Sequence, residues 1–119
     1  MGYERVDQAE LDSFVKLHRD FMEGRMGGRR MILKNKDLSG LSLKGKDLRQ
    51  ASITSCLMQQ MNLSGANFRE ASLYACDLTN ANLTNTIFIR SDLRGSRIES
   101  VDLTGANLDS ADLRVGGIS

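Results

Sequence analysis

The chain has 119 residues, with 16 Lys and Arg against 15 Asp and Glu, so its formal net charge is +1. A chain of this length is expected to form one domain, and a charge so close to zero creates no strong field for binding a polyanion. No hydrophobic run approaches a membrane span, and the N-terminus lacks both a secretory pattern and the Ser or Thr of a myristoylation site, so we expect a cytoplasmic protein.

Residues 1–30 carry the pattern of a helix followed by a linker. Asp7 and Glu10 have the spacing of a helix start and Gly24 is typical of a helix end, which predicts a helix over about residues 8–23. Its expected apolar stripe contains Leu11, Phe14, Val15, Phe21 and Met22, with Leu17 at the flank. A helix this short needs a surface to pack on, so we predict that it caps the N-terminal end of the segment that follows. A helix that binds a partner is the alternative.

His18 falls on the same predicted helix face as Phe14 and Phe21, which favours a half-buried packing residue over a catalytic base or metal ligand. The linker RMGGRR contains glycines that permit a chain reversal. We interpret its basic residues as a solvated linker rather than a site for an acidic partner; they are Arg25, Arg29 and Arg30.

From residue 33 onward, every fifth residue is apolar. The members are Leu33, Leu38, Leu43, Leu48, Ile53, Met58, Leu63, Phe68, Leu73, Leu78, Leu83, Phe88, Leu93, Ile98, Leu103, Leu108, Leu113 and Ile118. A spacing of five matches neither a helix nor a strand, so these side chains all point inward only if the backbone bends by about 90° at each repeat. Such a chain closes a square after twenty residues, and successive squares stack as parallel strands ~4.8 Å apart.

The units ANFRE, CDLTN, ANLTN, SDLRG and ANLDS resemble the A-(D/N)-L-x-x unit of the pentapeptide-repeat family, over about residues 31–119. The resemblance implies an all-β solenoid, a right-handed quadrilateral parallel β-helix with four pentapeptides per coil, here roughly four and a half coils. Lys36 and Lys46 depart from the pattern because small apolar residues belong at their positions. We expect their stems to extend out of the coil, and residues 31–50 to be less regular than the chain from Ala51 onward.

Two sets of interior residues follow from the twenty-residue coil. Leu48, Phe68, Phe88 and Leu108 are expected to form one core ladder. Cys56 and Cys76 are also one coil apart, but their stacked Cβ atoms would lie ~4.8 Å apart, farther than a disulfide needs. We therefore predict free interior thiols, with a redox switch or metal site as the alternative.

A candidate interaction patch lies on the outside of the expected coil. Ile87 and Ile89 occupy outward positions where other repeats have polar residues. Nearby arginines complete the patch; they are Arg49, Arg69 and Arg90. The alternative is that these are ordinary scattered apolar residues. Since Glu70 and Asp109 oppose the arginines, we do not expect direct nucleic-acid binding.

The sequence contains no catalytic triad, phosphate-binding loop or metal-ligand spacing, so we expect no enzyme activity and no cofactor. A non-catalytic interaction or structural scaffold module is the leading interpretation. The family resemblance implies an alternative, a DNA mimic that modulates DNA gyrase or another topoisomerase. Such mimics carry strongly acidic faces and a C-terminal dimerisation module, whereas residues 31–119 contain ten Lys and Arg against nine Asp and Glu and end in repeat-like sequence.

The last coil has no cap in the sequence and should expose its apolar interior residues, Leu103, Leu108 and Leu113. This favours an end-to-end homodimer through the C-terminal coil. The alternative is that the chain is a piece of a longer protein.

Overall fold

The computed structural model describes residues 2–115 of the chain, so the expected apolar position Ile118 lies outside the described residues. The elements are β1 (Glu4–Arg5), α1 (Gln8–Met22), β2 (Ile32–Lys34), β3 (Lys36–Asp37) and β4 (Ser52–Thr54). β1 pairs with β3 and β2 pairs with β4, both in parallel.

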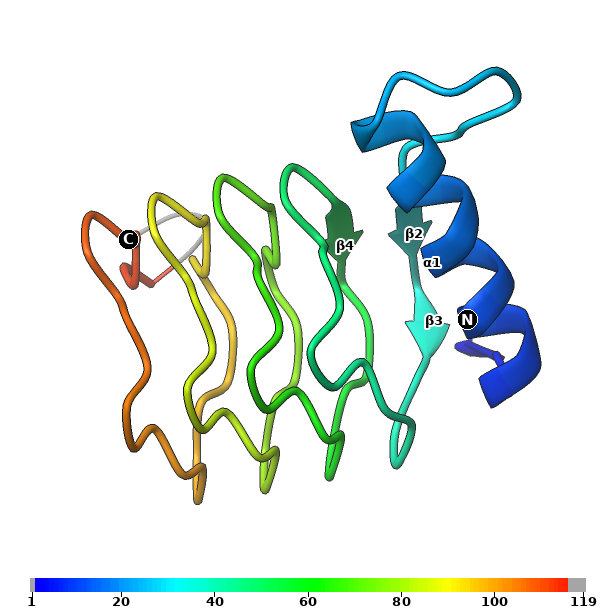
Figure 1. Cartoon of the computed structure of the whole chain (residues 1–119). Helices are drawn as coiled ribbons and strands as arrows, with labels where there is room; N and C mark the ends of the chain where they lie inside the picture. The colour runs from blue at the N-terminus through cyan, green and yellow to red at the C-terminus, as the bar shows by residue number, and fades with distance from the viewer. Residues whose placement is uncertain (1, 116–119) are drawn as a thin grey trace.

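Parallel pairing continues along the chain at a constant offset of twenty residues. β2 and β4 align Leu33 with Ile53, and isolated bridges follow from Asp37–Leu57 to Asp92–Asp112. The chain therefore rises as stacked four-sided coils (Figure 1). We call the four sides walls A, B, C and D. In the first coil they contain residues 32–34, 37–39, 42–44 and 47–49, respectively, and in each later coil they contain the residues twenty positions further on. The N-terminal end of the stack is called its lower end and the C-terminal end its upper end.

The corners between walls share one backbone conformation. Every fifth residue from Asn35 to Ser110 has a positive φ, including non-glycine residues such as Ala75 at 58°. Where Asp or Asn precedes the central apolar residue, its side chain stabilises the turn, as where the Arg94 N–H donates to Asp92 Oδ1 at 3.0 Å. This local bond explains why Asp and Asn recur in the repeat.

The interior holds the apolar residues of the repeat in vertical columns. Phe68 and Phe88 stack on wall D with ring centroids 5.6 Å apart and planes 7° from parallel. Leu48 lies below them and is fully buried, whereas Leu108 above them is partly buried. The central apolar residues are buried as far as Leu93 and become more exposed in the last coil.

Helix α1 lies across the N-terminal end of the coils (Figure 1). A capping box of Asp7 and Glu10 starts the helix, as the sequence predicts. Leu11 and Val15 are buried in the same apolar cluster as the first coil, but Phe21 is 42% exposed. The prediction that Phe21 belongs to the buried stripe is wrong, because buried His18 takes that place at the rim of the coil.

The loop between α1 and β2 folds back against the last turn of the helix. The Arg29 N–H donates to the Leu17 carbonyl at 2.9 Å. A Cβ on Gly28 would lie 2.6 Å from the backbone carbon of Asp20, so only glycine permits this close approach. The glycines of the linker thus produce the predicted reversal.

The lower edge of the first coil is covered in a different way on each of walls B, C and D. On wall B, β1 adds a strand, which the sequence analysis did not predict. On wall C, the Gln8 side chain accepts from the Ser42 N–H at 2.8 Å and donates to the Ser42 carbonyl at 2.9 Å. On wall D, His18 Nε2 donates to the Arg49 carbonyl at 2.8 Å.

The two lysines of the first coil do not disrupt it. Lys36 forms an ion pair with Glu4 of β1, and Lys46 is exposed. The bridges Ser42–Asn62 and Asp47–Asn67 have the same offset as those of later coils, so the expected irregularity is not seen on walls C and D. Residues 32–37 do differ from the coils that follow β4, because they form the strands β2 and β3 instead of isolated bridges. Within residues 2–115, no helix combines the length and the apolar character needed to cross a membrane.

Candidate interaction surfaces

Wall D brings the five residues of the predicted patch onto one side of the molecule. Arg49, Arg69 and Ile89 occupy the same column, because residues twenty apart are stacked. Ile87 bridges to Asn67 below it, and Arg90 follows at the adjacent corner. The repeat thus places residues from three coils next to one another.

Two of the three arginines in this patch have acidic partners. Arg49 makes a bidentate contact with Asp47, with nitrogen–oxygen distances of 2.8 and 2.7 Å, and this contact lowers the pKa of Asp47 despite partial burial. Arg90 Nη1 lies 3.6 Å from the Glu70 carboxylate. Because these charges are largely balanced, the patch offers apolar area and hydrogen-bond donors more than net positive charge.

Ile87 and Ile89 are both half-buried rather than fully exposed. Residues of the neighbouring coils cover part of each side chain. The sequence alone does not reveal this coverage. The patch is therefore a shallow apolar strip flanked by guanidinium groups.

Wall A carries a second ordered set of charges, which the sequence analysis missed. Asp92 pairs with Arg94 at 2.9 and 2.8 Å, and Asp112 pairs with Arg114 at 3.0 and 2.7 Å. The Arg114 hydrogen bonds lower the pKa of Asp112 to about 2. Arg94 also lies over the ring of Tyr74, 5.4 Å from its centroid. The three Asp-Leu-Arg triplets of the sequence and the spacing of twenty between Tyr74 and Arg94 could have revealed this set.

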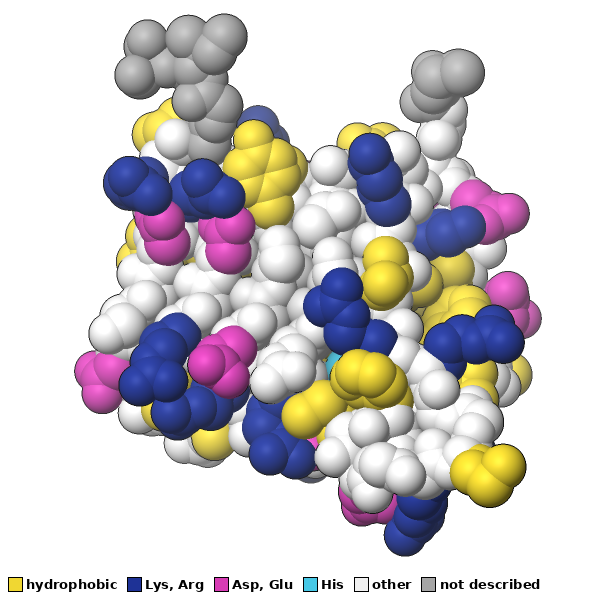
Figure 2. All heavy atoms as spheres, turned by 90° about the horizontal axis from the view of Figure 1, so that it is seen from above, with side chains coloured by type: hydrophobic (Ala, Val, Ile, Leu, Met, Phe, Trp, Pro, Cys, Tyr) yellow, Lys and Arg dark blue, Asp and Glu magenta, His cyan; other side chains and the backbone are white. Residues whose placement is uncertain are grey.

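Figure 2 shows basic side chains lying against acidic ones along the stacked coils. The pairs Asp92–Arg94 and Asp112–Arg114 each place a carboxylate and a guanidinium two residues apart on the same wall. The outer surface of these coils therefore alternates in sign over short distances and has no extended acidic stripe at these positions.

Both cysteines are buried free thiols. Cys76 Sγ donates to the Ile53 carbonyl at 2.9 Å, and Cys56 Sγ donates to the Thr54 carbonyl at 3.3 Å. Burial raises the pKa of both thiols, that of Cys76 to about 12. Thiols held protonated in this way are poor nucleophiles and poor metal ligands.

The chemistry available for catalysis or metal binding is sparse. The single histidine, His18, is fully buried, and both of its ring nitrogens bond to backbone groups. Across residues 2–115, no three His, Cys, Asp or Glu side chains gather as a metal site requires.

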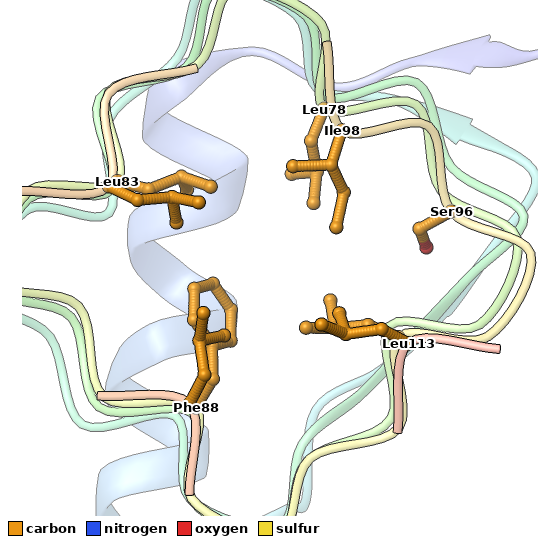
Figure 3. Close-up of a pocket in the computed structure, with 9 residues that line it drawn as sticks. Leu78, Leu83, Phe88, Ser96, Ile98 and Leu113 are labelled. Carbon is orange, nitrogen blue, oxygen red and sulfur yellow. The ribbon is translucent and has the colours of Figure 1, made fainter. Parts of the chain in front are cut away.

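The upper end of the coils contains a cavity of about 330 Å³. Figure 3 shows Leu83, Phe88, Ile98 and Leu113 pointing from different walls toward its centre. Leu103 and Leu113 are 38% and 54% exposed. The apolar interior is therefore accessible at the last described coil.

Comparisons with known proteins agree with this architecture. Residues 32–69, 47–85 and 76–114 match a family model described as pentapeptide repeats, with eight copies. The sequence matches no curated protein.

Solved structures of pentapeptide repeat proteins are similar to this chain. HetL, involved in heterocyst differentiation regulation in the cyanobacterium Nostoc, has a TM-score of 0.50 and 29% identity over 66% of this chain and 38% of HetL. A protein of the Arabidopsis thaliana thylakoid lumen has a TM-score of 0.47 and 26% identity over 71% of this chain and 66% of its own length. QnrB1, a plasmid-mediated fluoroquinolone resistance protein, has a TM-score of 0.37 and 20% identity over 71% of this chain and 54% of its own length.

The chain thus spans well under half the length of HetL. The family model, by contrast, matches most of this chain, and its repeats coincide with the stacked coils. The chain belongs to the pentapeptide-repeat family.

Proposed function

We propose that this chain is a non-catalytic protein-interaction module built on a right-handed quadrilateral β-helix, with α1 as the cap of its N-terminal end. The parallel bridges at intervals of twenty residues support the β-helix, and the burial of Leu11 and Val15 against the first coil supports the cap.

The binding surface of this module is the wall D patch of Ile87, Ile89, Arg90, Arg69 and Arg49. The observation that carries this assignment is the pair of isoleucines on wall D, where the coils below and above place Asn67, Arg69, Asn107 and Asp109. Apolar residues in the outward columns of a repeat protein form a strip that a partner can dehydrate.

The test is a pull-down from cytoplasmic extract of the source organism, comparing the unmodified chain with an Ile87→Asp/Ile89→Asp variant. A partner that binds wall D is lost with the variant. Asn82→Asp/Thr84→Asp, at the same repeat positions on wall C, is the matched control and should retain the partner. An unchanged list of captured proteins would remove the patch from consideration.

The exposed interior of the last described coil supports a second proposal, end-to-end self-association through Leu103 and Leu113. Sedimentation at increasing protein concentration should show a dimer that Leu113→Glu abolishes. A strict monomer at high concentration would contradict this arrangement.

The alternative of a DNA mimic has less support. Asp47, Asp92 and Asp112 each pair with the arginine two residues further on, so they do not present free negative charge. A duplex mimic needs a continuous acidic face. A supercoiling assay with purified gyrase should therefore show no effect of this protein.

A further inference from the structure

β2 differs from the rest of the first coil at its lower edge. β1, Gln8 and His18 supply hydrogen-bond partners to the lower edges of walls B, C and D. Wall A begins with β2, whose upper neighbour is β4. A strand added on the other side of β2 would be its lower neighbour.

The hydrogen-bond pattern shows which groups of β2 face that lower edge. The Ser52 N–H donates to the Met31 carbonyl at 2.9 Å and the Asn35 N–H donates to the Thr54 carbonyl at 3.3 Å. Since backbone groups alternate in direction along a parallel strand, the N–H and C=O of Ile32 and Lys34 point away from β4. Within residues 2–115, no backbone or side-chain group bonds to these four.

Ile32 is the reason that the edge stays open. At this position of wall A, later coils have Ser52, Ser72, Asp92 and Asp112, and each Asp side chain accepts from the N–H two residues on, as Asp92 does from Arg94. Ile32 has no such acceptor, so the Lys34 N–H is available. Ile32 is also 63% exposed, which is unusual for a branched apolar side chain.

An apolar groove of about 420 Å³ runs beside this edge, between β2 and α1. Phe14 and Leu17 of α1 form one side, and Ile32 and Leu33 of β2 belong to the other. In an added strand, every second side chain would point toward α1 and could enter this groove.

The charge around the groove is basic. The charged residues that line it are Arg29, Arg30 and Lys36, and no acidic residue lines it. Lys36 is paired with Glu4, whereas Arg29 and the adjacent Lys34 are exposed. An acidic segment would complement this rim.

We propose that β2 binds an extended, acidic peptide segment of a partner protein, which adds a strand below wall A and places apolar side chains in the groove against Phe14 and Leu17. The open backbone groups supply the hydrogen bonds of strand addition, the apolar groove receives alternate side chains, and the basic rim favours an acidic segment. This site is separate from the wall D patch and does not depend on it.

The test selects linear peptides from a displayed random library on the immobilised full chain and measures the enriched peptides by fluorescence anisotropy. We expect acidic sequences with alternating apolar residues. Their amide shift changes in the 15N-labelled protein should be largest at β2 and along α1 near Leu17. High salt should weaken the binding.

Three substitutions separate strand addition from other modes. Ile32→Pro removes an outward N–H that makes no bond in the folded chain, and Ile32→Asn supplies the missing acceptor for the Lys34 N–H. Each should weaken binding by about tenfold or more. Lys34→Glu should also weaken it, whereas Lys44→Glu, the same charge change at the equivalent position of wall C, should not.

The proposal is overturned if no peptide is enriched, if enriched peptides bind Ile32→Asn as well as the unmodified chain, or if the shift changes map to another wall. A dimer that Ile32→Pro dissociates would also overturn it, because the occupant would then be a second copy of this chain.

Discussion

His18 is buried between α1 and the first coil, and each of its ring nitrogens meets a backbone group. Nδ1 accepts from the Met31 N–H at 2.9 Å, while Nε2 faces the Arg49 carbonyl at 2.8 Å. These partners assign the neutral tautomer with its proton on Nε2. The sequence favours a half-buried packing residue at His18, and the structure shows a fully buried one that links the helix, the loop and wall D.

His18→Phe should destabilise the protein although it keeps an apolar ring in place. Two backbone groups would lose their partners, and we expect a cost of about 2–4 kcal/mol in the free energy of unfolding. Urea denaturation measures this change. Ser13→Ala, on the exposed side of the same helix, should change the free energy by less than about 0.5 kcal/mol. Equal effects would mean that the two hydrogen bonds contribute nothing.

Cys76 should make the protein less stable in alkali. Its thiol ionises near the usual pKa of 9.0 in the unfolded chain, whereas burial raises the pKa to about 12 in the folded chain. The resulting stabilisation is complete below about pH 9 and is lost as the pH rises toward about 12. Relative to Cys76→Ala, the free energy of unfolding should fall by about 1 kcal/mol between pH 8 and about pH 10. Parallel pH profiles of the two proteins would exclude this contribution.

The elements at the N-terminus supply hydrogen-bond partners to three walls of the first coil. The strand β1 pairs with wall B, the side-chain amide of Gln8 bonds to wall C, and the imidazole of His18 bonds to wall D. Side-chain amides suit this role because they offer one donor and one acceptor, as a peptide group does.

Gln8→Ala should destabilise the chain by about 1–2 kcal/mol, since it leaves the Ser42 N–H and C=O without their partners. Gln8→Glu should also destabilise it, because a carboxylate accepts from the N–H but repels the carbonyl. Thermal or urea unfolding measures both. Gln59→Ala removes an exposed side-chain contact to Asp77 and is the control, with an expected change below about 0.5 kcal/mol.

The sequence predicts the repeated coil well and the ends poorly. The spacing of apolar residues predicts which positions stack, because each repeat carries its own turn residues and needs only its neighbours. β1 has two residues and no periodicity, so its pairing with β3 depends on where α1 docks. The bonds of Gln8 and His18 depend on the same docking, and the half-burial of Ile87 depends on the coils above and below it.

At the scale of the whole molecule, local stability should decrease from the central coils to the last described coil. The central apolar residues are fully or nearly fully buried from Leu38 to Leu93, and exposure then rises to 38% at Leu103 and 54% at Leu113. Each coil is stabilised by contact with its neighbours, so a coil with an open face is less stable.

In the monomeric protein, at concentrations below those of any end-to-end association, amide hydrogen exchange should follow this gradient. We expect the slowest exchange in the coils that contain Leu63 to Leu83 and the fastest among the coil residues from Ser96 to Val115. Mass spectrometry of peptic fragments or NMR measures it. Uniform protection along the chain would contradict the gradient and would indicate that the upper end is covered in solution.

The constant offset of twenty residues also limits how such a gene can change in length. Duplicating or deleting twenty residues within the coils adds or removes one whole layer and leaves every later residue on its original wall. An insertion or deletion of five residues keeps the leucines in the interior, but it moves every later residue to an adjacent wall. Such a change between Tyr74 and Arg94 would move these two residues onto different walls, and one between Arg49 and Arg69 would do the same to that pair. Surface contacts, rather than the core, would therefore be lost.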